Sequence, residues 1–186
     1  MAAKEPDPVR KRELLEISRR LELVPWELPE TFHDAVQSMW LTQVMAYLSY
    51  GIGGICAVGR PDQYLYPYFA QIRDKRDDCE PLSVHGLIDE LLVKLSNNLI
   101  PLPSFAKETA SEFGADSMAV TIGGTDIDGN DSTNELSSLF LDSIVRLRGM
   151  SNTYSVRIHR NSPQKFLDKV AEAHKTPCAI ALFNDE

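Results

Sequence analysis

Cysteine is scarce in this chain, with three in 186 residues, at Cys56, Cys79 and Cys178. An odd number at wide spacing does not form a disulfide framework, and no two make the C-x-x-C pair of a structural zinc site. Cys56 and Cys178 lie in apolar runs and Cys79 lies among acidic residues, so none has the setting of a nucleophile. This cysteine usage favours the reducing cytoplasm.

Basic residues and long apolar runs are also few. The chain has 19 Lys and Arg against 27 Asp and Glu, a formal net charge of -8. A nucleic-acid surface would need a basic stripe, and none is evident. No apolar run is long enough to span a bilayer, and residues 1–20 lack the apolar core of a secretory signal. We therefore expect neither a nucleic-acid partner nor a membrane partner.

Metal-ligand patterns are incomplete. The four histidines include no pair at the spacing of metal ligands on one helix. Asp126, Asp128 and Asn130 match the start of an EF-hand calcium loop, but Asp131 replaces its glycine and Ser137 its bidentate glutamate. The other interpretation is a polar loop whose Asp and Asn cap the next helix. We predict no metal site.

Residues 1–114 are predicted to be mainly helical. Thr31 is a suitable N-cap, and Asp34 three residues later makes a variant of the capping box. The helix that Thr31 starts is apolar on most sides, which predicts burial in a large body. Helical periodicity or helix-start signals mark four stretches, at residues 8–23, 31–50, 61–66 and 84–99.

In residues 115–186 short apolar strands alternate with helical stretches, and this pattern predicts a βαβαβ unit. Short apolar strands are expected at residues 118–122, 154–158 and 178–183. Helices are expected at 130–148 and at 163–174, the second with Ser162 as N-cap and Pro163 at N1. Strands that alternate with helices predict parallel strands, so the fold class is α/β.

The last strand has two interpretations. If it is buried on both faces it lacks a covering helix, which predicts that the chain is an internal part of a larger enzyme. Alternatively, it is an edge strand of a complete domain. The carboxyl ends of parallel strands carry active sites in α/β folds, and alternation puts Arg157 and His159 on one face there. A structural salt link is an equal alternative for Arg157.

Five segments together resemble the large domain of glycyl radical enzymes of the pyruvate formate-lyase type. They occur in the order of that family and span nearly the whole chain. Gly59 to Phe69 reads GRPDQYLYPYF, and Thr121 to Ser137 contains TIGGTD followed by DGND and TNELS. The five are residues 29–38, 59–69, 121–137, 155–159 and 181–186.

The resemblance implies that residues 1–186 are an internal part of a pyruvate formate-lyase-like domain, within a ten-stranded α/β barrel. In that family a stored glycyl radical generates a cysteine thiyl radical, which abstracts hydrogen from a small-molecule substrate. A separate iron–sulfur activase that uses S-adenosylmethionine installs the glycyl radical. A homodimer is an assembly that the resemblance allows.

Neither radical residue of the family is matched here, so we assign no catalytic residue and no bound cofactor to this chain. We expect the isolated chain to be inactive. Arg157, His159 and Asn184 are the residues that we predict to face the active site. The residues that separate lyases from dehydratases lie largely outside the match, so the substrate stays open. The alternative function is a non-catalytic remnant or subunit that pairs with another chain, and a weaker one is an independent calcium-binding domain.

Overall fold

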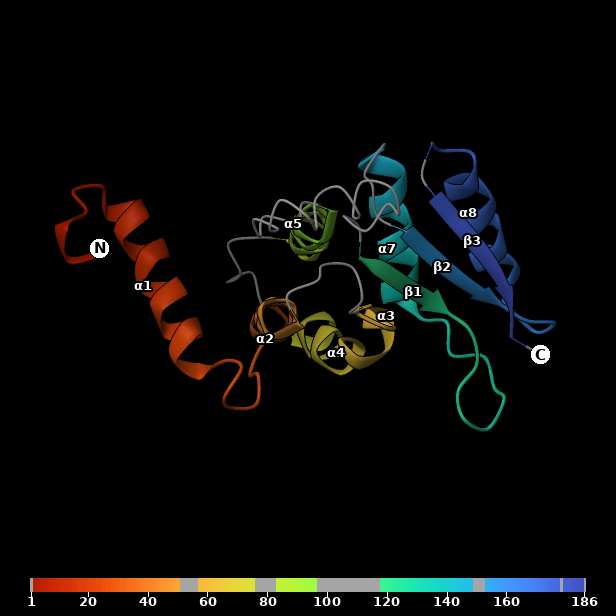
Figure 1. Ribbon diagram of the computed structural model, residues 1–186, viewed down its shortest axis with the longest axis horizontal. Helices are drawn as coiled ribbons and strands as arrows, with labels where there is room; N and C mark the ends of the chain where they lie inside the picture. The colour runs from red at the N-terminus through yellow and green to blue at the C-terminus, as the bar shows by residue number, and fades with distance from the viewer. Residues whose placement is uncertain are drawn as a thin grey trace.

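The structure is a computed structural model in which a small sheet and its helices lie at one end and a single helix at the other (Figure 1). All three cysteines fall outside its described part, as does the predicted loop at residues 101–114. Among the described helices, none combines the length and the apolar character needed to cross a bilayer. The described residues are 2–50, 57–75, 83–96, 118–148, 153–177 and 179–185.

The N-terminal part begins with a short 3-10 turn, η1 (Ala2–Lys4), and two long helices, α1 (Pro8–Leu23) and α2 (Phe32–Tyr50). The predicted capping box is confirmed: Thr31 N donates to Asp34 Oδ2 over 3.2 Å, and Asp34 N donates to Thr31 Oγ1 over 3.1 Å. The fully buried Asp34 also lies 3.2 Å from Arg20 Nε, an ion pair that joins α1 to α2.

Within the described residues, the burial predicted for α2 is seen mainly in its first half. Phe32, Ala35 and Val36 are buried, whereas Met45 is 39% exposed and Leu48 is 63% exposed. Helix α2 packs against α4 and α5, and in its second half Gln43 is also buried.

Three shorter helices follow: α3 (Pro61–Tyr64), α4 (Tyr66–Lys75) and α5 (Val84–Ser96). Pro61 starts α3 at N1, where its missing N–H costs no hydrogen bond. The helix predicted at residues 84–99 is confirmed over Val84–Ser96, and its apolar residues at helical spacing form its buried face. That face consists of Leu87, Ile88, Leu91, Leu92 and Leu95.

The sheet has three strands, β1 (Ala119–Gly123), β2 (Thr153–Ile158) and β3 (Ala179–Asn184), in the order β1-β2-β3. Both pairings are parallel, and the crossovers contain α7 (Glu135–Arg146) and α8 (Gln164–His174). The predicted α/β class with parallel strands is confirmed. Gly59 adds a single parallel bridge to Val120 on the other side of β1.

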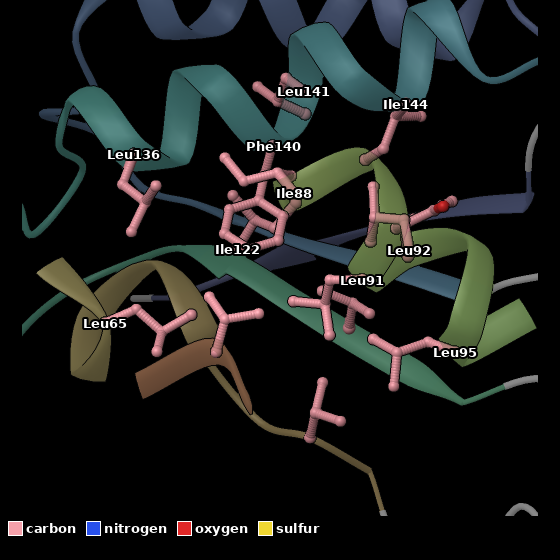
Figure 2. Close-up of a cluster of buried hydrophobic side chains, with 14 of the residues drawn as sticks. Leu65, Ile88, Leu91, Leu92, Leu95, Ile122, Leu136, Phe140, Leu141 and Ile144 are labelled. Carbon is pink, nitrogen blue, oxygen red and sulfur yellow. The ribbon is translucent and has the colours of Figure 1, made fainter. Parts of the chain in front are cut away.

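The two faces of the sheet differ in chemistry. Val120, Ile122, Tyr154 and Val156 are fully buried, and Figure 2 shows Ile122 within a cluster that includes Phe140 of α7 and Ile88 of α5. Residues of opposite parity, such as Thr121 and Ser155, are only half-buried. The sheet therefore has one face against the apolar core and one more open face of small and polar side chains.

Two local predictions need correction. Helix α7 begins at Glu135, not at residue 130, because Asn134 and Ser137 form the capping box. Helix α8 has Pro163 as its N-cap, and the Ser162 hydroxyl instead accepts from His159 N over 3.0 Å. For strand β3, the described residues leave both faces partly open, with Leu182 48% exposed and Phe183 50% exposed, and this does not decide between the two interpretations of the strand. Strand β3 is the edge strand of the described sheet.

Candidate functional site

The end of β1 is tied to α3 through Asp62. The Asp62 Oδ2 atom accepts from Gly123 N over 2.9 Å and from Ser137 Oγ over 2.6 Å. Its side chain is fully buried, and Oδ1 has no hydrogen-bond partner among the described residues. Burial raises the pKa of Asp62, against the opposing effect of the bonds from Ser137 and Gly123. Asn134 Nδ2 donates to Asp62 O over 2.9 Å, so the start of α7 joins the same cluster.

The segment after β1 folds into a narrow hairpin, residues 124–132, called here the β1–α7 hairpin. Ser132 N donates to Gly124 O over 3.0 Å, and Asp126 N donates to Asn130 O over 2.9 Å. The Asp126 carboxylate accepts from Asp128 N over 2.9 Å and from Asn130 N over 2.8 Å. These bonds, first those from Asn130, lower the pKa of Asp126. The Asp126 carboxylate thus closes its own turn and does not cap the next helix, whose N-cap is Asn134.

Residues of the Gly-Arg-Pro-Asp-Gln segment hold the base of this hairpin. Arg60 Nη1 donates to Thr125 O over 2.8 Å, and Arg60 Nη2 donates to the Ser132 hydroxyl. Gln63 Nε2 donates to Ser132 O over 3.0 Å. Both sides of the hairpin are therefore held from α3 and the residue before it.

His159 holds the far side of the hairpin. Its Nε2 lies 3.0 Å from Asp131 Oδ1, and Asn161 N donates to its Nδ1 over 3.3 Å. Because Nδ1 accepts, the proton of the neutral ring belongs on Nε2, which donates to Asp131. The His159 side chain is 4% exposed. With both nitrogens in use, the ring orients Asp131 and leaves no free site for proton transfer.

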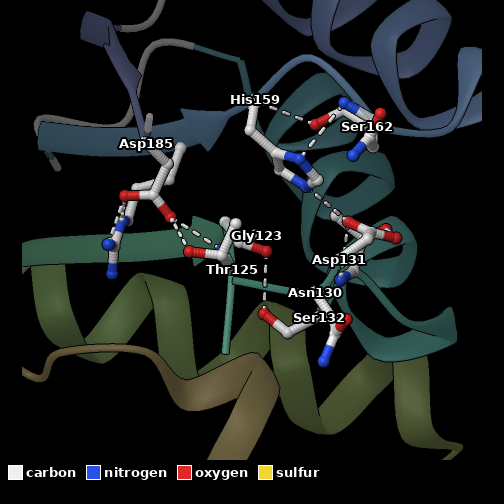
Figure 3. A network of polar contacts seen from close by, with 12 residues as sticks. Gly123, Thr125, Asn130, Asp131, Ser132, His159, Ser162 and Asp185 are labelled. Carbon is white, nitrogen blue, oxygen red and sulfur yellow. Dashed lines mark hydrogen bonds and ion pairs between the residues drawn. The ribbon is translucent and has the colours of Figure 1, made fainter. Parts of the chain in front are cut away.

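Asp185, which follows β3, completes the network. Asp185 Oδ2 accepts from Thr125 N over 2.7 Å and from Thr125 Oγ1 over 3.0 Å. Asp185 Oδ1 accepts from Arg157 Nε over 2.7 Å and also from Arg157 Nη2. Desolvation acts to raise the pKa of Asp185, but the bonds from Thr125 and Arg157 together lower it. Figure 3 shows the contacts between Asp185 and Thr125 beside the His159–Asp131 pair.

The three residues predicted to face the active site do not all lie on the same side of the sheet. Arg157 and His159 lie at the carboxyl end of β2. His159 contacts Asp131 of the β1–α7 hairpin, and Arg157 contacts Asp185, which bonds to the hairpin. The register pairs Arg157 with Phe183 and Ile158 with Asn184, so alternation sends Arg157 and Asn184 to opposite faces. The salt link that the sequence allowed for Arg157 exists, with Asp185.

Two residues central to this network were not singled out from the sequence. Asp62 and Asp185 both lie within family-like segments, and that membership is the only signal the sequence offers for them. Among the described residues, no three or more His, Cys, Asp or Glu side chains are grouped to hold a metal ion.

Comparison with known proteins identifies the family. The pyruvate formate lyase-like family model matches residues 1–186. The chain is 35% identical to isethionate sulfite-lyase of Nitratidesulfovibrio vulgaris and 30% identical to trans-4-hydroxy-L-proline dehydratase of Clostridioides difficile, over 100% and 92% of its length. Each match covers 22% of the relative, so the chain spans about a fifth of the length of these curated relatives.

The fold comparison agrees with the sequence comparison. A crystal structure of a glycyl radical enzyme from Archaeoglobus fulgidus superposes with a TM-score of 0.78 and 36% identity. It covers 98% of this chain, which in turn covers 23% of that structure. The α/β segment described above is thus a segment that glycyl radical enzymes contain, and the chain belongs to the pyruvate formate lyase-like family.

Proposed function

We propose that this chain forms part of the barrel wall of a glycyl radical enzyme of the lyase or dehydratase type. In such an enzyme a thiyl radical abstracts hydrogen from a small-molecule substrate. The observation that carries the proposal is the convergence of four family-like segments at the carboxyl edge of the sheet. Arg60, Thr125, Arg157 and Asp185, one from each, share a continuous set of hydrogen bonds.

The arrangement supports an active-site role for this edge. In α/β folds, ligands bind outside the carboxyl ends of the strands. Arg157 lies there with 34% of its side chain exposed, and Asp185 takes only its Nε and Nη2 donors. We keep Arg157 and His159 as residues facing the active site, with His159 as an orienting group, and we no longer place Asn184 with them because it points to the opposite face from Arg157. Residues 1–186 form an internal part of the family's domain, with 115–186 in the barrel.

The family also implies a cofactor and partners for the complete enzyme. The glycyl radical is installed there by an iron–sulfur activase that uses S-adenosylmethionine, and this chain itself holds no cofactor. The complete enzyme acts in the cytoplasm on a small molecule, and the family resemblance allows a homodimer. None of these assignments depends on a nucleic-acid or membrane partner.

A chimera tests the proposal. Residues 1–186 replace the matched segment of trans-4-hydroxy-L-proline dehydratase of Clostridioides difficile, and circular dichroism and size-exclusion chromatography establish that the chimera folds. After treatment with its activase, the chimera is expected to give the glycyl radical doublet in electron paramagnetic resonance and to turn over substrate. A folded, radical-bearing chimera without turnover contradicts an active-site role for this segment.

The isolated chain supplies the matched control. It is expected to give no glycyl doublet under the same treatment, and a doublet would overturn the proposal. The alternative function, pairing with another chain, is favoured by one observation, the exposure of Leu182 and Phe183 on the edge strand β3. Size-exclusion chromatography separates the two, because a well-behaved monomer argues against pairing.

A further inference from the structure

The carboxylate of Asp185 joins two strands that are not neighbours. The order β1-β2-β3 places β2 between the other two, so β1 and β3 lie about 9–10 Å apart at ~4.8 Å per strand spacing. Yet Asp185, directly after β3, accepts two hydrogen bonds from Thr125, which follows β1 by two residues. The chain that leaves β1 must therefore cross the carboxyl end of β2.

Two glycines make this crossing. Gly123 and Gly124 have φ values of 75° and 96°, in the region that favours glycine. A Cβ on Gly124 would lie 2.6 Å from Asp185 Oδ2 and 2.9 Å from Arg157 Cβ. A Cβ on Gly123 would lie 2.9 Å from Arg157 O. The backbone at this point thus rests on Arg157 of β2 and against the carboxylate of Asp185.

Both oxygens of the Asp185 carboxylate accept hydrogen bonds from residues at this crossing. Arg157 donates twice to Oδ1 and Thr125 donates twice to Oδ2, and the side chain is 9% exposed. Bonds that involve an ionised group are stronger than neutral ones, and the fork of Arg157 fixes the direction of the carboxylate. A carboxylate in this position therefore holds the hairpin against β2 more firmly than an amide would.

We propose that Asp185 is a positioning residue, which fixes the β1–α7 hairpin across the carboxyl end of β2. It thereby sets the placement of Arg157 and of the Asp131–His159 pair, the groups assigned above to the active-site edge. The inference rests on the proposed function for the role of those groups. The positioning itself rests only on the geometry of Gly124, Thr125, Arg157 and Asp185.

Amide hydrogen exchange on the full 186-residue chain tests the proposal, with the Asp185→Ala and Asp185→Asn variants. The decisive amides are those of Asp126 and Ser132, which bond within the hairpin and not to Asp185. Their exchange is expected to accelerate about tenfold or more in Asp185→Ala, because charge-assisted bonds that hold the hairpin are lost. Amides in the middle of β1 and β2 are expected to keep their rates.

Asp89→Asn is the matched control. It breaks a comparable ion pair, in which Arg146 Nε and Nη2 donate to Asp89 over 2.8 and 2.6 Å between α5 and α7. That pair lies away from the hairpin, so the exchange of Asp126 and Ser132 is expected to stay unchanged. Acceleration of the Thr125 amide alone in the Asp185 variants would overturn the proposal, because the carboxylate would then cap one donor and position nothing.

Chemical rescue separates positioning from general stabilisation. Asp185→Ala leaves space for a small carboxylate beside Arg157, and sodium formate is expected to restore slow exchange of Asp126 and Ser132. Sodium chloride at equal ionic strength is not. Equal acceleration across the whole chain without rescue by formate would overturn the proposal. The chimera experiment tests the proposed function separately, and the exchange rates expected here do not depend on its result.

Discussion

The amide of Gly123 donates a 2.9 Å hydrogen bond to Oδ2 of Asp62, although 61 positions separate the two residues. This bond joins the end of β1 to the four-residue helix α3, and both residues belong to segments that resemble the family. The carboxyl group is fully buried, and no described cation donates a hydrogen bond to it. Burial thus favours the neutral form of this carboxyl group, whereas the two hydrogen-bond donors favour its charged form.

The first prediction concerns Asp62→Asn. Burial raises the pKa of Asp62 above 3.8, so the folded chain holds a proton that the unfolded chain releases once the pH exceeds 3.8. Stability therefore falls as the pH rises from 3.8 through the raised pKa. An amide does not ionise, so Asp62→Asn is expected to remove this decline. Urea unfolding at several pH values measures it.

A hydrophobic variant provides the control for Asp62. Asp62→Leu leaves the Gly123 amide and the Ser137 hydroxyl without their acceptor, at a cost of about 1–3 kcal/mol for each buried group. It is expected to be destabilised at every pH. If Asp62→Asn is as unstable at pH 7 as Asp62→Leu, the site requires a carboxylate and the inference that burial favours the neutral form is wrong.

The second prediction compares two glycines that share a positive φ. Gly129 has φ 81° and open space around it, whereas a Cβ on Gly124 would meet Asp185 and Arg157. Gly129→Ala is expected to cost only the backbone penalty, about 1–2 kcal/mol. Gly124→Ala is expected to cost about 1–3 kcal/mol more from steric overlap. Thermal unfolding measures both, and equal costs would show that the crossing tolerates a side chain.

Much of the fold follows from local signals. The leucine spacing of α5 and the Thr31–Asp34 capping box are short-range patterns, and both appear as expected. The start of α7 was placed too early because Asn130 and Asn134 are both suitable caps. The choice depends on Asp62, whose backbone oxygen accepts from Asn134 and not from Asn130.

The site network depends on contacts that no local pattern specifies. Arg157 and Asp185 lie 28 positions apart, and the sequence allowed a salt link for Arg157 without naming its partner. Ser162 looked like an N-cap, but its hydroxyl accepts from His159 N in the turn after β2. For a polar group at the end of a strand, the sequence offers several chemically equivalent hydrogen-bond partners. Only the three-dimensional arrangement decides which of them it contacts.

The third prediction tests the start of α7 through Asn134→Ala. The Asn134 side chain accepts from Ser137 N over 3.0 Å and donates to Asp62 O over 2.9 Å. Loss of the cap is expected to cost about 1–2 kcal/mol of unfolding free energy. Asn161→Ala is the control, since Asn161 is exposed and its hydrogen bond comes from the backbone, so a change within about 0.5 kcal/mol is expected. Equal effects would refute the capping role.

The fourth prediction concerns His33, which lies near the Arg20–Asp34 ion pair. Burial, and then the charge of Arg20, lower the pKa of His33 from 6.5 to about 4. Between these values the unfolded chain binds a proton that the folded chain does not, so stability falls as the pH drops from 6.5 towards 4. An NMR titration of the His33 ring is expected to give a midpoint of about 4.

A substitution connects this titration to stability. His33→Gln removes the titrating group, so the loss of unfolding free energy between pH 6.5 and pH 4 is expected to shrink relative to the wild type. The same change at the exposed His85 leaves His33 in place and should preserve that loss. A His33 midpoint near 6.5 would mean that water reaches the ring and that Arg20 is not held beside it, which would contradict the Arg20–Asp34 ion pair between α1 and α2.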